Sequence, residues 1–208
     1  MAPSDTKYQT QHIPLKAKYP GGFDALFLLG FMNQLPGTLS ERDRPAIDAL
    51  SSDQLWQDCQ DTIKRSIGLF KQAGYDLEVE DYHFTILLGN PEKPMLQLNK
   101  GYSGDGGIPG YLMLSLLPND YTLPRVQAAL AHECNHNVRF QFIKWNQQTT
   151  LADWVVSEGL AESFAAELYG KELIESWVTS TSSEQLEEIK PIISSQLQLT
   201  GMAEMAPY

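Results

Sequence analysis

Two histidines four residues apart lie in the stretch HECNH at residues 132–136. On an α-helix, positions i and i+4 share one face, so His132 and His136 can direct ring nitrogens at one metal ion. Glu133 lies beside the first histidine, where its carboxylate can take a proton from a metal-activated water and pass it to a leaving group. The alternative is an ordinary helix whose two histidines hydrogen-bond at a surface. The motif alone leaves both interpretations open.

A catalytic zinc ion takes three protein ligands and keeps a fourth position open. One class of zinc proteases, the metzincins, supplies the third ligand from a histidine six residues further on, but Arg139 and Phe142 occupy the positions of its glycine and histidine. Glu158 follows His136 by 22 residues, enough for one helix to end and the next to return antiparallel. Glu162, one turn later, is placed to accept a hydrogen bond from the far nitrogen of a ligating histidine.

The alternative for the two glutamates is a solvated acidic face. The apolar residues around them nearly encircle the predicted helix and therefore predict that it is buried. These residues are Trp154, Val155, Val156, Leu160, Ala161, Phe164 and Ala165. Buried carboxylates need partners, and a metal ion with its histidines would provide them. Cys134 falls on another face of its helix, so we expect a small buried apolar residue and not a ligand.

Three stretches resemble a known group of enzymes: GGIPGYLMLSLLPN, LPRVQAALAHECNHNVRF and VVSEGLAESFAAELYG, which lie roughly between residues 106 and 170. They are similar to the gluzincin peptidases, which include thermolysin and the M1-type aminopeptidases. The closer resemblance is to the bacterial family of predicted zinc-dependent proteases typified by YjaZ. It implies one zinc ion held by His132, His136 and Glu158, with Glu133 as general base, and it implies no particular substrate. The spacing from His136 to Glu158 is slightly longer than in thermolysin-like enzymes, which bears on the loop between the helices.

The elements that must position these residues follow from periodicity and from turn residues. Residues 1–22 read as an extended arm and 23–33 as a short apolar helix. Leu55, Cys59, Ile63, Ile67 and Phe70 predict an amphipathic helix that starts at Ser52 or Asp53 and ends at Gly74. Strands are predicted at 81–90, 94–99 and 110–118. Helices are predicted from Pro124 to about residue 144, from Thr150 to Gly170, and at 171–179 and 183–199.

This order predicts a single α+β domain with a zincin-like arrangement, in which a small mixed sheet packs on the helix that carries HECNH. Residues 23–122 would form a helical and sheet lobe, and residues 123–208 a helical lobe with the zinc site. The strand at 110–118 is either an exposed edge that binds an extended substrate or an internal strand of the core. The glycine-rich stretch at 101–110 is either a flap or a turn-rich connection.

A peptidase also needs a donor for the oxyanion of the tetrahedral intermediate. Candidates for that contact or for substrate binding are Tyr111, Arg139 and Tyr169, and more remotely His83 and Tyr208. The sequence does not choose among them.

The composition narrows the partners and the compartment. A formal net charge of −11 argues against nucleic acid or an anionic membrane as a partner. Two widely spaced cysteines, Cys59 and Cys134, make no disulfide framework and fit a reducing compartment. The first residues contain no apolar signal segment, and the apolar run at 25–32 is too short to span a bilayer. We therefore expect a cytoplasmic protein without membrane insertion.

Together these features predict a cytoplasmic zinc metallopeptidase that acts on a peptide or protein substrate. Two alternatives stay open: a zinc-stabilised interaction module that cleaves nothing, and a zinc hydrolase of a non-peptide amide. The sequence gives no oligomeric state.

Overall fold

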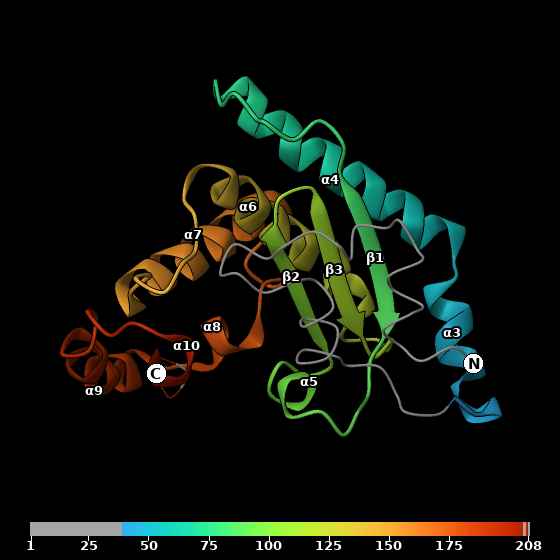
Figure 1. Ribbon diagram of the computed structural model, residues 1–208. Helices are drawn as coiled ribbons and strands as arrows, with labels where there is room; N and C mark the ends of the chain where they lie inside the picture. The colour runs from blue at the N-terminus through green and yellow to red at the C-terminus, as the bar shows by residue number, and fades with distance from the viewer. Residues whose placement is uncertain (1–38, 206, 208) are drawn as a thin grey trace, which may run out of the picture.

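The computed structural model describes residues 39–205 and 207. The predicted arm, the predicted helix at 23–33 and Tyr208 lie outside this part of the chain. The described residues form a small three-stranded sheet surrounded by helices, which confirms the predicted α+β class (Figure 1).

The described chain begins with a 3-10 turn at Glu41–Asp43, followed by helix α3 at Arg44–Leu50 and helix α4 at Asp53–Gln72. One face of α4 is buried, and its apolar members Cys59, Ile63 and Ile67 belong to the main core. Ser52 occupies the N-cap position as predicted. Gly74, with a φ of 89°, follows the last turn and ends the helix.

The sheet contains β1 at His83–Leu88, β2 at Tyr102–Ile108 and β3 at Tyr111–Leu116, in the order β1-β3-β2. Strand β1 is parallel to β3, and β2 is antiparallel to it. Strand β3 is thus paired on both sides, with Leu112 and Leu114 in the core. Of the two interpretations of residues 110–118, the internal strand is confirmed and the exposed edge is wrong.

Two stretches differ from the prediction. Residues 94–99 were expected as a strand but form helix α5 at Pro94–Leu98. The alternating leucines suggested one sheet face, yet Leu96 is buried while Leu98 is 74% exposed, as helical geometry allows. The glycine-rich stretch was expected as a flap or a connection, but most of it is strand β2. Close approach of β2 to the helix behind it explains the glycines, as described below.

Helix α6 at Val126–Phe142 follows a short 3-10 turn at Leu123–Arg125 and lies behind the sheet (Figure 1). It ends two residues before the predicted end. Twelve of its 17 residues are buried, because it packs on β2, β3, α4 and the following helix at once. Its apolar residues Val126, Leu130 and Val138 join the core between α4 and the sheet.

Helix α7 at Leu151–Tyr169 has the predicted ends: Thr150 caps its first turn together with Asp153, and Gly170 with a φ of 95° closes it. Its burial differs from the prediction. Val155, Val156 and Leu160 are 46–51% exposed, so the helix is apolar nearly all round without being buried all round. The reason is that α7 packs chiefly along one face, against α6.

The chain then forms α8 at Ser176–Ser180, α9 at Ser183–Ser194 and α10 at Met202–Met205. Both helices predicted after residue 170 are therefore shorter than expected. The segment after α9 returns to the start of α7, where the amides of Leu151 and Ala152 donate to carbonyl oxygens of residues 199 and 197. Within the described residues no helix is long and apolar enough to cross a membrane.

Candidate metal centre

The predicted ligands converge from two helices. His132 and His136 project from α6, one turn apart, and Glu158 reaches them from α7. The two Nε2 atoms are 2.9 Å apart, and Glu158 Oε2 lies 3.3 Å from His132 Nε2 and 3.4 Å from His136 Nε2. These ligand atoms all lie within 4.8 Å of one another. We call this set the ligand triangle.

The size of the ligand triangle suits a small tetrahedral ion. Nitrogen and oxygen ligands about 2.0–2.1 Å from a tetrahedral zinc ion are about 3.3 Å from each other. The three observed separations, 2.9, 3.3 and 3.4 Å, lie close to that value. Two histidines and one carboxylate are also the donor set of known catalytic zinc sites.

The far side of each ligand is held by a second contact. His132 Nδ1 lies 3.0 Å from Glu162 Oε1, and His136 Nδ1 lies 3.1 Å from Ser157 Oγ. Trp154 Nε1 donates to the second oxygen of Glu158 at 3.0 Å. Sequence analysis missed the roles of Ser157 and Trp154. Trp154 lies four residues before Glu158 and three before Ser157, and these spacings make it a neighbour of both on the surface of α7 and provide the signal that identifies it.

These outer contacts determine where lone pairs point. A carboxylate only accepts, so Glu162 favours the proton on Nδ1 of His132 and leaves the lone pair on Nε2. Donation from Nδ1 of His136 to Ser157 has the same effect on the second ring. Three acceptor atoms then face one another in a buried space, and a proton or a cation between them is needed to offset their repulsion. The residues present therefore fit a zinc ion.

Burial and the contacts within this cluster shift the pKa values of its members. Burial lowers the pKa of His132, but hydrogen bonds to Glu158 and Glu162 outweigh it and hold that pKa well above its usual value. Burial would raise the pKa of Glu158, yet hydrogen bonds from both histidines keep it below its usual value. Burial lowers the pKa of His136. Because a ligating histidine must be neutral, zinc binding at His132 competes with protonation of its ring.

Glu133, the residue after His132 on α6, meets strand β2. It is only 6% exposed, and burial, with Asp105 and Glu158 nearby, raises its pKa well above the usual range of a glutamate. A Cβ atom built on Gly104 would lie 2.1 Å from Glu133 Oε1, and one on Gly106 would lie 2.1 Å from the Glu133 carbonyl oxygen. Strand β2 therefore touches both the side chain and the backbone of Glu133.

Asn137, one residue after the second histidine, fastens this strand to α6. Its side chain is fully buried and accepts from the Gly110 amide at 2.8 Å. Its amide group also lies within hydrogen-bond distance of three carbonyl oxygens, at 3.0 Å from Gly106, 2.7 Å from Ile108 and 2.8 Å from Tyr111. Sequence analysis missed this residue, because an asparagine in a helix carries no signal for a partner so far along the chain.

The comparison with known proteins agrees with this geometry. Residues 55–208 match the model of a family described as predicted Zn-dependent protease (DUF2268). The chain belongs to this family. It is 33% identical over 209 residues to "Uncharacterized protein YjfC" of Bacillus subtilis (strain 168), an alignment that covers the whole chain and 69% of that relative. No solved structure matches the chain. The resemblance indicated by the sequence is thereby confirmed.

In this family member the candidate oxyanion donors have defined neighbours. The Tyr111 ring stacks on His83 with a centroid distance of 5.3 Å, and the Tyr169 hydroxyl lies 2.7 Å from Thr62 Oγ1 of α4. Arg139 lines a cavity of about 260 Å³ that Ser157 also lines. Arg139 thus shares a cavity with Ser157, which contacts His136. The catalytic roles of Tyr111, Arg139 and Tyr169 stay predictions.

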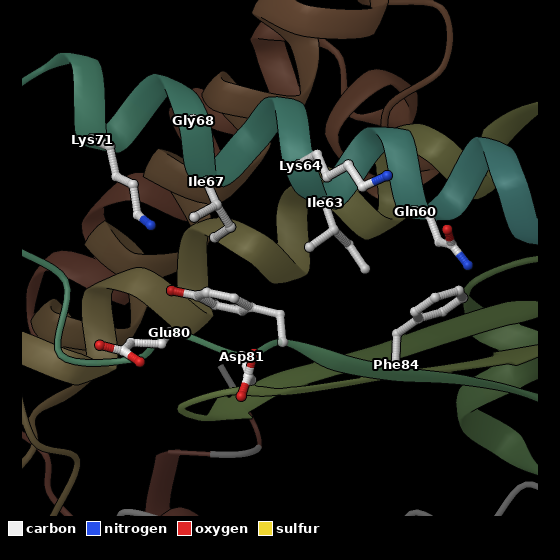
Figure 2. A pocket seen from close by; sticks show the side chains of 10 residues that line it. Gln60, Ile63, Lys64, Ile67, Gly68, Lys71, Glu80, Asp81 and Phe84 are labelled. Carbon is white, nitrogen blue, oxygen red and sulfur yellow. The ribbon is translucent and has the colours of Figure 1, made fainter.

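Other conspicuous features lie apart from the ligand triangle. Cys134 is fully buried and belongs, with Cys59, to the core between α4 and the sheet. A groove of about 500 Å³ lies between α4 and the start of β1, and Figure 2 shows Ile63 and Ile67 projecting from α4 toward the segment that carries Asp81 and Phe84. None of the candidate site residues lines that groove.

Proposed function

We propose that this protein is a zinc-dependent peptidase of the gluzincin type, in which His132, His136 and Glu158 hold one zinc ion. The ligand triangle is the observation that carries the proposal. Its donor types, its dimensions and its outer contacts each suit zinc, and the family described as predicted Zn-dependent protease supplies the coarse activity.

Bound zinc in such a site supplies a Lewis acid that polarises the scissile carbonyl and makes water acidic enough to ionise near neutral pH. Glu133 acts as the general base: its carboxylate takes the proton of the attacking water and returns it to the leaving amine. Glu162 and Ser157 orient the two imidazoles. Trp154 holds one oxygen of Glu158 and leaves the other free to face the histidines.

The sheet suggests how a substrate chain would lie. Strand β2 touches Glu133, and within the described residues it pairs on one side only, with β3. Its other edge offers backbone groups that an extended peptide can match by strand addition. This assigns to β2 the role that sequence analysis considered for the strand at 110–118.

Metal analysis and one substitution test the proposal. The purified protein should contain about one zinc ion per chain, and it should cleave fluorescein-labelled casein in a reaction that a chelator stops and zinc restores. The Glu133→Gln protein should bind zinc as the wild type does and lose at least about 10²-fold in kcat, because general-base catalysis typically contributes that much. Cleavage at the wild-type rate by Glu133→Gln would show that the mechanism is wrong. A zinc-loaded wild type that cleaves nothing would favour the interaction-module alternative.

A further inference from the structure

Strand β2 places glycines where its face meets α6. Gly104 and Gly106 alternate along the strand, so both point at the helix, and both point at the same residue, Glu133. Neither glycine has a positive φ, so backbone conformation does not require glycine at these positions. Glycine is required there by the lack of space, because a Cβ at either position would overlap Glu133.

The two contacts differ in kind. At Gly104 the overlap is with the Glu133 carboxylate: a Cβ would lie 2.1 Å from Oε1, 2.6 Å from Cδ and 2.7 Å from Cγ. At Gly106 the overlap is with the backbone, 2.1 Å from the carbonyl oxygen and 2.8 Å from the carbonyl carbon of Glu133. A side-chain end can move away from a new methyl group, whereas the backbone of a buried helix resists.

Three further contacts fix the position of this strand. Asn137 binds the carbonyl of Gly106 and the turn that follows, which ties the strand to α6 one turn beyond Glu133. The Gly107 amide donates to Asp105 Oδ1 at 2.8 Å, and the pairing with β3 is irregular between Asp105 and Ile108. A bulge of this kind re-aims a strand locally. The distance between β2 and Glu133 is therefore set by specific contacts.

We propose that Gly104 is a positioning residue for Glu133, whose carboxylate it holds in place by leaving a space of matching size, while Gly106 and Asn137 keep β2 at that distance from α6. The inference rests on the proposed function, in which Glu133 is the general base. The three atoms nearest to a Cβ at Gly104 all belong to the Glu133 side chain, so Gly104 acts through Glu133.

The test compares Gly104→Ala with Gly68→Ala. Gly68 lies in α4, where a Cβ would meet nothing within 4 Å, so its substitution controls for the added methyl group. Gly104→Ala should fold and bind zinc with wild-type affinity, because no ligand atom is displaced. Its kcat on fluorescein-labelled casein should fall by about 10- to 100-fold, the cost of moving a catalytic group by roughly 1 Å. Gly68→Ala should keep the wild-type kcat.

A double substitution separates positioning from a general structural defect. If Gly104 acts only through Glu133, then Gly104→Ala/Glu133→Gln should be no slower than Glu133→Gln alone, within about twofold. A double variant slower by the full factor of the glycine substitution would overturn the proposal. The proposal would also be overturned if Gly104→Ala kept the wild-type kcat while Glu133→Gln was inactive.

Crystal structures of the wild type and of Gly104→Ala decide the inference independently of activity. The expected result is a Glu133 carboxylate displaced by on the order of 1 Å over an unchanged α6 backbone. An unmoved carboxylate with β2 shifted outward would overturn the positioning role. A wild type that cleaves no casein would reject the proposed function, and this structural comparison would still show whether Gly104 places Glu133.

Discussion

Helices α6 and α7 both contribute to the ligand triangle, but they pack in different ways. Twelve of the 17 residues of α6 are buried, whereas α7 buries five of its 19. Four residues of α7 belong to the ligand triangle or contact it, namely Trp154, Ser157, Glu158 and Glu162. Substitutions in α6 should therefore lower the stability of the whole fold. In α7, substitutions on the side that faces α6 should change zinc binding, and substitutions on the exposed side should change stability only slightly.

Loss of the Asn137 side chain should give the largest effect on stability. Asn137→Ala leaves the Gly110 amide and three carbonyl oxygens without their partner, and unsatisfied buried groups cost about 1–3 kcal/mol each when water cannot reach them. With partial hydration of those groups, we expect a loss of about 4 kcal/mol in the free energy of unfolding, measured with urea.

The matched change in α7 is Val156→Ala, which truncates a side chain that is 51% exposed. It should cost less than about 1 kcal/mol, because little of its apolar surface leaves water on folding. Equal losses for the two variants would contradict the contrast between the helices.

The next largest effect concerns the ligand from α7. Glu158→Gln removes the charge of the only ligand that this helix supplies to the ligand triangle. Zinc affinity should fall by about 100-fold or more, equivalent to about 2.7 kcal/mol. Competition with a chelating dye measures it, and Glu167→Gln, an exposed change on the same helix, serves as the control. Unchanged affinity in Glu158→Gln would exclude Glu158 as a ligand.

Glu162 should matter less, because it acts through His132. Outer partners of this kind typically contribute 10- to 100-fold in metal affinity, so Glu162→Gln should weaken zinc binding by about that factor. In the metal-free protein the same substitution should lower the pKa of His132, since one of the three carboxylates that raise it loses its charge. An NMR titration of the histidine ring protons would report this shift, and an unchanged pKa would argue against the contact.

The smallest effect is expected on the outer face of α7. A Cβ on Gly159 meets nothing within 4 Å, and glycine inside a helix is less favourable than alanine by about 0.5–1 kcal/mol. Gly159→Ala should therefore stabilise the protein by that amount in thermal unfolding. Destabilisation would indicate that something covers this face in the native protein.

The parts of the site that depend on local geometry were predictable from the sequence. The four-residue spacings of His132 with His136 and of Glu158 with Glu162 fix which way the side chains point, and the caps at Thr150 and Gly170 placed the second helix. The structure brings the three predicted ligands together, although their role as zinc ligands stays a proposal.

The parts that depend on distant neighbours were not predictable. Glycine is unfavourable in strands, so a ten-residue run with five glycines predicts a loop unless another element approaches closely, and only the folded chain shows that Glu133 does so. The apolar outer face of α7 suggested burial, but composition does not tell which side of a helix has a neighbour. Asn137 binds residues about 30 positions earlier, beyond the reach of any periodic pattern.

The two buried cysteines allow local opening of the core to be measured by thiol labelling. Cys59 on α4 and Cys134 on α6 are both unpaired and fully buried, and burial, with Asp58 nearby, raises the pKa of Cys59 to about 12. A thiol reagent can react with them only when the packing of α4, α6 and the sheet opens, so the rate of labelling measures how often that happens. Because neither thiol belongs to the ligand triangle, labelling with and without zinc would show how far the metal centre restrains the core around it.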